Sequence, residues 1–166
     1  MPVTDITKDV DARTLTITAE FAAPVERVWA LYADPRQLEQ VWGPPEYPAT
    51  FVDHDLRPGG RMTYYMTSPE GERFAGFWEV QEVDEPTGFT FRDGFADSDF
   101  RPNPELPVSL NEYAFTETDR GTRAVFTSRY DSADAMQKVL DMGMEEGARS
   151  SINQVDGFLA NNTQDA

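Results

Sequence analysis

One aromatic-rich stretch, residues 21–45 (FAAPVERVWALYADPRQLEQVWGPP), constrains the fold more than any other part of the chain. Pro24 suits a first helical position, where its missing N–H costs nothing. One apolar helix face follows at the i, i+3, i+4, i+7 spacing. Its members are Val25, Val28, Trp29 and Tyr32. Asp34 and Pro35 then predict an N-cap and the start of a second short helix, which Gly43 ends. Two short helices with such aromatic faces need a large apolar surface beneath them.

The remaining chain predicts that surface as an antiparallel sheet. Residues 13–21 alternate between apolar and polar, which is typical of a half-buried strand. Further strands are predicted in segments 50–56, 62–66, 72–83, 89–91, 108–117 and 122–130. A break in alternation near Gln81 and Glu82 predicts a bulge. The first twelve residues are compatible with either a short edge strand or a mobile end.

A single long helix is predicted from Asp131 or Ser132 to about Leu159, with one apolar stripe and two glycines, Gly143 and Gly147. Together these elements predict one α+β domain over residues 1–166. Its core spans about residues 13–160, with flexible polar ends. The architecture is a curved antiparallel sheet around the C-terminal helix, with two short helices between the first two strands.

Charge and composition exclude several classes of protein. The formal net charge of −16 opposes binding to nucleic acid or to anionic membranes. We interpret this negative charge as a surface that keeps the protein soluble, with adaptation to high salt as the alternative. There is no cysteine, no apolar run long enough to span a membrane and no signal-peptide core. We therefore expect a cytoplasmic protein without membrane insertion.

Three motifs in order resemble one family. They are the strand, A-P-x-x-x-V-W, D-P and W-G-P pattern of residues 21–45, the D-L-R-P-G-G-R run of residues 55–61, and Glu146-Gly147 with the apolar positions after it. The pattern resembles the Aha-type domain of the START-like SRPBCC superfamily, named after the activator of a heat-shock-protein ATPase. The resemblance covers about residues 15–159. It implies a helix-grip fold and a hydrophobic ligand pocket between the sheet and the last helix.

The inward set of side chains is rich in aromatic residues and methionine, which suits an adaptable pocket as well as an ordinary core. The predicted ligand-binding residues are His54, Met62, Tyr64, Met66, Phe74, Trp78, Phe89, Phe91, Asn111, Tyr113, Phe115, Phe126, Met144, Ala148 and Ile152. Ala148 stands where the family commonly has tryptophan. This departure predicts a cavity that opens between the long helix and the irregular loop of residues 95–107.

Catalytic patterns are sparse. His54 is the single histidine, and its alternation with Val52 and Leu56 predicts that it points inward at the pocket mouth. No second histidine or cysteine is available to complete a zinc site with it, and no nucleotide-binding glycine motif or nucleophile elbow is present. We expect no metal and no cofactor, and the sequence leaves open whether any reaction is catalysed.

Three functions remain. The first is a soluble binding protein for a small hydrophobic or amphipathic molecule. The second is an enzyme of cyclase or hydrolase type that uses the same pocket, with His54, Tyr64, Asn111 or Tyr113 as acid, base or orienting group. The third is a co-chaperone of a heat-shock-protein ATPase. It ranks last, because the eukaryotic activator carries a further N-terminal domain. The oligomeric state stays open, with a homodimer among the alternatives.

Overall fold

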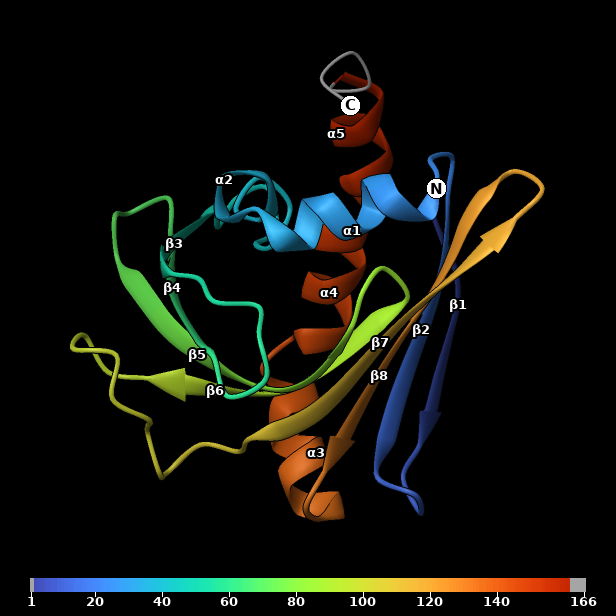
Figure 1. Ribbon diagram of the computed structural model, residues 1–166. Helices are drawn as coiled ribbons and strands as arrows, with labels where there is room; N and C mark the ends of the chain where they lie inside the picture. Colours follow the sequence, from blue (N-terminus) through green and yellow to red (C-terminus); the bar gives the residue numbers. More distant parts are fainter. Residues whose placement is uncertain (1, 162–166) are drawn as a thin grey trace.

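The computed structural model describes residues 2–161, in which eight strands form one open antiparallel sheet (Figure 1). The strands are β1 (Val3–Asp9), β2 (Thr14–Phe21), β3 (Ala49–Asp53), β4 (Arg61–Thr67), β5 (Arg73–Asp84), β6 (Gly88–Ala96), β7 (Ser109–Thr118) and β8 (Gly121–Tyr130). Their order across the sheet is β1-β2-β8-β7-β6-β5-β4-β3. The curved sheet partly surrounds a column of C-terminal helices, so the predicted α+β helix-grip fold is confirmed.

The N-terminal residues settle the alternative that the sequence left open. Residues 3–9 form the edge strand β1, which pairs with β2. The two short helices therefore follow the second strand and not the first. The predicted alternation of residues 13–21 is confirmed, since the apolar positions of β2 are all buried. The expected flexible C-terminal tail concerns residues 162–166, which lie outside the described part.

The short helices α1 (Val25–Ala33) and α2 (Pro35–Leu38) lie across the inner face of the sheet. Asp34 is the predicted N-cap, and its carboxylate accepts a hydrogen bond from the Arg36 backbone N–H at 2.9 Å. The predicted buried face of α1 is confirmed. In it, Trp29 contacts Phe89 with ring centroids 5.9 Å apart, and Tyr32 stacks on Phe115 at 5.5 Å. These contacts give the two helices the apolar support that their sequence requires.

The C-terminal helix is broken, so the prediction of one continuous helix is wrong. It divides into α3 (Ala133–Asp141), α4 (Met144–Asn153) and α5 (Val155–Asn161). Ser132 caps α3 as predicted, with its hydroxyl accepting from the Ala135 N–H at 3.0 Å. Gly143 then adopts a φ of +86°, a left-handed conformation that ends α3 and that glycine adopts without steric cost. The apolar face predicted for one long helix is therefore divided among three short helices.

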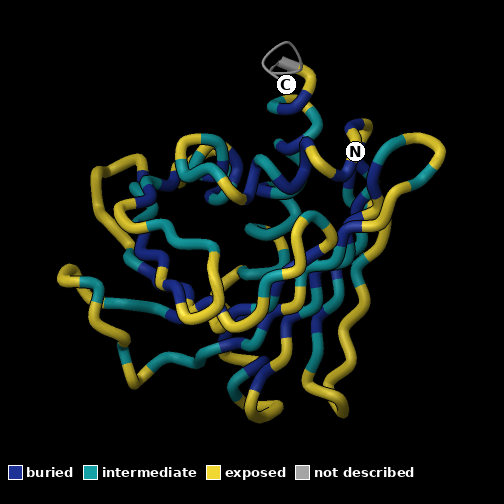
Figure 2. Tube along the Cα trace, in the orientation of Figure 1, coloured by how far each residue is buried: buried dark blue, intermediate teal, exposed yellow. Residues whose placement is uncertain are grey.

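The hydrophobic core fills the inner face of the sheet beneath α1 and the C-terminal helices (Figure 2). Trp78 lies at its centre and is fully buried. The predicted bulge is confirmed by a register shift between Val80 and Glu82 in the pairing of β5 with β6. Because of this shift, Trp78 and Val80 before the bulge and Val83 after it all contact the core despite the break in alternation.

The outer edge of β3 is covered by side chains from the segment that contains α2. The Arg36 guanidinium donates to the Phe51 carbonyl oxygen at 2.7 Å. The Phe51 N–H donates to the Glu39 carboxylate at 3.0 Å. Arg36 and Glu39 also form an ion pair with each other at 3.6 Å. The central residue of this edge strand therefore has both backbone groups satisfied.

Candidate functional site

The inner face of the sheet brings together most of the predicted ligand-binding residues. The buried members are Met62, Tyr64, Trp78, Phe89, Phe91, Asn111, Phe115 and Phe126. The half-buried members are His54, Met66, Tyr113, Met144, Ala148 and Ile152. Aromatic rings are in direct contact at the centre, where Trp78 stacks on Phe91 with centroids 3.9 Å apart.

Two inward predictions are wrong in detail. Phe74 lies at the end of β5 beyond the core, is 52% exposed, and pairs with the ring of Tyr47 at 6.2 Å. Val52 is 54% exposed and lines the outer face, because a register shift between Phe51 and Asp53 breaks the strict alternation on which its placement depended.

A carboxylate that sequence reasoning missed lies at the polar end of this face. Asp93 follows Phe89 and Phe91 on the inward positions of β6 and accepts a hydrogen bond from the Tyr64 hydroxyl at 3.0 Å. Burial raises the pKa of Asp93 to about 7, which the Tyr64 hydrogen bond partly opposes. Its carboxyl group therefore exchanges a proton near neutral pH, as a general acid or base would require.

Other tyrosines share this polar region. Burial, and then the Asp93 carboxylate, raise the pKa of Tyr64 and of Tyr130 above the ordinary value. For Tyr113 the causes are burial, then Tyr32, then Asp93. These hydroxyl groups therefore stay protonated and can donate hydrogen bonds at physiological pH.

Two buried indole donors lie in this region. The Trp78 N–H has no hydrogen-bond partner among residues 2–161, and the Trp42 N–H has only the Tyr64 hydroxyl nearby, where it lowers the pKa of Tyr64. Trp42 contacts both Trp78 and Tyr64 ring to ring, at 4.9 and 5.7 Å. A buried N–H without an acceptor costs about 1–3 kcal/mol, so a polar guest that accepts from these groups would be stabilised.

Asn111, in contrast, is fully engaged by its neighbours. Its side-chain N–H donates to the Ser109 hydroxyl at 3.0 Å, and its side-chain oxygen accepts from the Ser128 hydroxyl at 2.7 Å. This network joins β7 and β8. The polarity of Asn111 is therefore explained by the structure alone. The polar groups that remain available to hydrogen-bond a ligand are Asp93, Tyr113 and the two indoles.

The wall opposite the sheet is formed by α4, which is loosely packed. Ser151 is its single buried residue, while Met144, Ala148 and Ile152 contact the core yet keep accessible surface. The nearest atom that a Cβ on Gly147 would meet is a side-chain carbon of Pro44, at 3.8 Å. Small side chains therefore leave α4 with less contact to the core than α1 has.

His54 has a structural partner. Its Nε2 lies 2.9 Å from the Tyr32 carbonyl oxygen at the end of α1. A carbonyl can only accept, so Nε2 carries the proton and donates. This bond connects the segment after β3 to α1, and the ring also contacts Phe51 edge to face, with centroids 6.3 Å apart.

Two shallow hollows lie elsewhere, on the outer face of the sheet. One, of about 330 Å³, is lined by residues of β3, β4, β5 and the first part of the loop after β6. The other, of about 380 Å³, is lined by Gly59, Gly60 and parts of β4, β5 and β6. Neither lies between α4 and the loop, where the sequence predicted an opening. The far part of that loop reaches α3 instead, where Lys138 donates to the Glu105 carbonyl oxygen at 3.1 Å.

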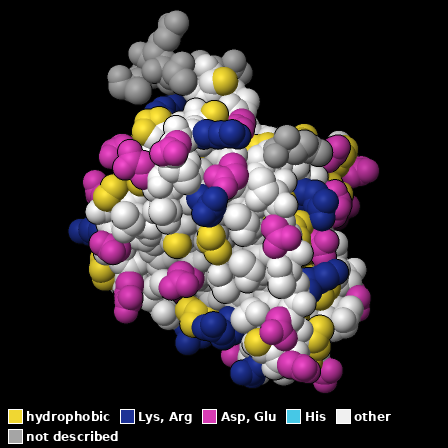
Figure 3. All heavy atoms as spheres, turned by 90° about the vertical axis from the view of Figure 1, so that its right-hand side faces the viewer, with side chains coloured by type: hydrophobic (Ala, Val, Ile, Leu, Met, Phe, Trp, Pro, Cys, Tyr) yellow, Lys and Arg dark blue, Asp and Glu magenta, His cyan; other side chains and the backbone are white. Residues whose placement is uncertain are grey.

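Charged side chains are interspersed over the face that carries β1 (Figure 3). Basic groups are seen there among acidic ones and do not form a continuous patch. Within the described residues, no three histidine or acidic side chains could together hold a metal ion. None of the helices among residues 2–161 is long and apolar enough to cross a membrane.

Comparison with known proteins gives a consistent result. Residues 22–160 match the family described as Activator of Hsp90 ATPase homolog 1-like protein. A crystal structure of protein Ms6760 from Mycobacterium smegmatis is 66% identical, with a TM-score of 0.89 over 95% of this chain and 97% of that one. A solution structure of a protein from Arthrobacter aurescens is 43% identical, with a TM-score of 0.92 over 96% of this chain and 92% of that one. No functionally curated protein matches the chain.

Proposed function

Since the chain belongs to the family of Activator of Hsp90 ATPase homolog 1-like proteins, with a START-like helix-grip fold of a general ligand-binding type, we propose that it binds a small amphipathic molecule. The molecule lies between the inner face of the sheet and α4. Its apolar part contacts the aromatic and methionine side chains there, and its polar part meets Asp93 and its neighbours.

One observation carries this proposal. The inner face combines apolar walls with polar groups whose hydrogen-bonding capacity is incompletely used, among them the Trp78 indole N–H and the Asp93 carboxylate. A core built only for stability would satisfy these groups or replace them by apolar ones. Tyr113 and Ala148 are only half-buried, so a ligand can contact them. Ligand sites of this kind are mostly apolar, with a few polar groups that fix orientation.

The test uses a neutral apolar dye, Nile red, whose emission rises on leaving water. Ala148→Trp would fill the space beneath α4, so it should weaken dye binding several-fold while the protein stays folded. Ala133→Trp is the matched control, because Ala133 is exposed on the first turn of α3. It should leave dye affinity unchanged. Absence of dye binding to the parent, together with strong destabilisation by Ala148→Trp, would show that the interior is packed core.

A second candidate is an enzyme of cyclase or hydrolase type, favoured by the Tyr64–Asp93 pair. A carboxyl group that titrates near pH 7 beside a tyrosine hydroxyl is suited to proton transfer in a water-poor site. Hydrolysis of p-nitrophenyl esters of increasing chain length tests this reading. A hydrolysis rate whose pH dependence shows one ionisation near pH 7, and which is lost in Asp93→Asn, would support an enzyme. A rate unaffected by Asp93→Asn would contradict it.

Three further points remain proposals. Action on a heat-shock-protein ATPase, as the family description suggests, ranks third, and it is tested by the ATPase rate with and without this protein. We propose that the protein is soluble and cytoplasmic and does not bind nucleic acid. We also propose that the protein can form a homodimer, and a measurement of its molecular mass in solution tests this.

A further inference from the structure

The hollow of about 330 Å³ on the outer face is separated from the inner site by the sheet itself. Its floor is formed by outward side chains of three neighbouring strands, Val52, Tyr65 and Ala75. Its far wall is the start of the loop after β6, which contributes Ser98 and Phe100. The volume is at the lower end of the range for small-molecule sites.

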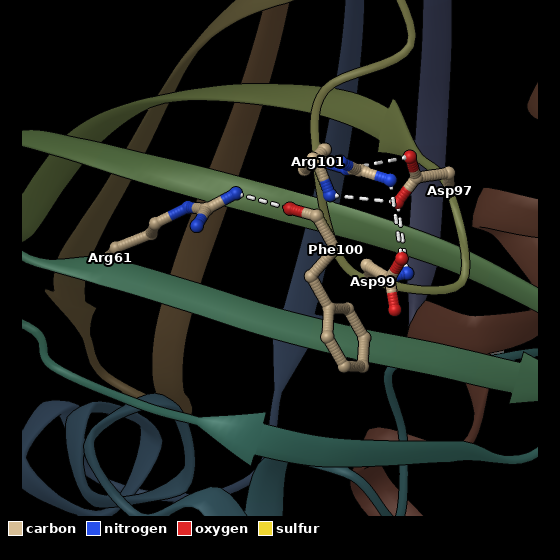
Figure 4. A network of polar contacts seen from close by, with 5 residues as sticks. All are labelled: Arg61, Asp97, Asp99, Phe100 and Arg101. Atoms are coloured by element: carbon tan, nitrogen blue, oxygen red, sulfur yellow. Dashed lines mark hydrogen bonds and ion pairs between the residues drawn. The ribbon is translucent and has the colours of Figure 1, made fainter.

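The loop is held against the sheet by a defined set of polar contacts (Figure 4). The Arg61 guanidinium donates to the Phe100 carbonyl oxygen, and the Phe100 N–H donates to the Asp97 carbonyl oxygen at 2.9 Å. The Asp97 carboxylate accepts from the backbone N–H groups of Asp99 and Arg101 at 2.9 and 3.0 Å. The loop wall is therefore an ordered turn.

Phe100 occupies a conformation that is unfavourable for its residue type. Its φ of +63° is in the left-handed region, which a bulky side chain seldom adopts. Such a backbone conformation is strained and persists only where the surroundings fix it. In Figure 4 its ring extends over the strands, away from the turn that holds its backbone. The contacts of Arg61 and Asp97 thus maintain a geometry that adds an aromatic wall to the hollow.

Arg73 supplies a positive charge to the same hollow. Its guanidinium lies over the Tyr65 ring, 4.3 Å from the centroid, so its position is defined by a cation–π contact. Within residues 2–161 it makes no ion pair or hydrogen bond, whereas Asp97, the acidic residue of this hollow, is paired with Arg101 at 3.2 Å. An oriented guanidinium without a carboxylate partner is well suited to bind one.

We propose that this hollow is a second binding site, for a small molecule with one carboxylate and a short apolar body. Arg73 binds the carboxylate. Val52, Tyr65 and Phe100 contact the apolar body, and a long chain or a second negative charge is disfavoured by the small volume and the adjacent Asp97. This site is independent of the ligand proposed for the inner face.

Octanoate is the probe, with 1-octanol as its uncharged counterpart, and binding is followed by amide chemical shifts in ¹H–¹⁵N spectra. Octanoate should produce saturable shifts at Val52, Ala75 and Ser98, while 1-octanol should not. Arg73→Gln should weaken octanoate binding about tenfold, because one charge-assisted contact is lost. Arg129→Gln is the matched control, since it makes the same charge change on an exposed position of β8, and it should bind octanoate as the parent does.

Three results would overturn the proposal. The first is an octanoate shift pattern confined to inner-face residues such as Met66 and Tyr113, and the second is no saturable pattern at all. The third is equal octanoate affinity of the parent and Arg73→Gln. If Arg73→Gln changes the spectrum of the free protein widely, Arg73→Lys provides the second variant. It keeps the charge but not the planar guanidinium, so it should bind octanoate more weakly than the parent and more tightly than Arg73→Gln, and affinity no higher than that of Arg73→Gln would also overturn the proposal.

Discussion

Replacing Asp93 by asparagine should change how stability depends on pH. The carboxyl group lies on the inner face, accepts from Tyr64 at 3.0 Å, and has its pKa raised from 3.8 to about 7 by burial. Asparagine has nearly the same shape and keeps an oxygen for the Tyr64 hydroxyl, but it does not titrate. The variant therefore removes one ionisation and leaves the packing in place.

The size of the effect follows from the two pKa values. The folded protein holds the Asp93 proton more tightly than the unfolded chain, so this contribution to stability is fully present below about pH 4. It is lost as the pH rises through about 7. The interval between the two pKa values corresponds to about 4 kcal/mol in total, of which about 2–3 kcal/mol falls between pH 5 and 8.

Urea denaturation at pH 5, 6, 7 and 8 measures this difference. Tryptophan fluorescence is the signal, because Trp42 contacts both Tyr64 and Trp78 in the core. From pH 5 to 8 the parent should lose about 2–3 kcal/mol more unfolding free energy than Asp93→Asn. Asp119→Asn, in the exposed turn between β7 and β8, should follow the parent. Parallel curves for the parent and Asp93→Asn would refute the reasoning, because they would mean that Asp93 does not titrate in this range.

Three further substitutions test the packing. Trp29→Ala should lower the unfolding free energy by about 3–5 kcal/mol in chemical denaturation, since the ring is buried against Phe89, and a loss below about 1 kcal/mol would contradict that placement. Gly76→Ala should cost about 1–3 kcal/mol and shift the Tyr64 ring resonances, because a Cβ there would lie 2.4 Å from the Tyr64 hydroxyl oxygen. His54→Ala should cost about 0.5–1.5 kcal/mol through the lost bond to α1, and unchanged thermal stability would argue against that bond.

Local signals predicted most of the fold. The alternation of residues 13–21, the cap at Asp34 and the bulge near Glu82 each have one short-range cause, and each is found in the structure. The break at Gly143 was missed because the apolar stripe continues through it. A glycine in a helical pattern either weakens the helix or ends it, and the sequence alone does not distinguish these outcomes.

The candidate site was predicted less completely, for a physical reason. Its apolar members were assigned from their alternation, but Asp93 was not recognised among the 30 acidic residues. The available signal was its position, two residues after Phe91 on the same face of β6. Extending the strand past Phe91 would have revealed an inward carboxylate. Its pairing with Tyr64 depends on how β4 and β6 lie on either side of β5, which no local pattern specifies.

The side chains that cover the edge of β3 affect how two copies of this protein can associate. An uncovered edge strand is a template on which a strand of a neighbouring molecule adds, and such addition underlies both domain swapping and fibril growth. Here an incoming strand would first have to displace the Arg36 and Glu39 side chains from Phe51. Each is a charge-assisted bond of about 1.5–3 kcal/mol, so growth of the sheet beyond β3 is opposed at its central position. Two copies that associate at this end of the sheet would therefore do so through side-chain surfaces and not through backbone pairing.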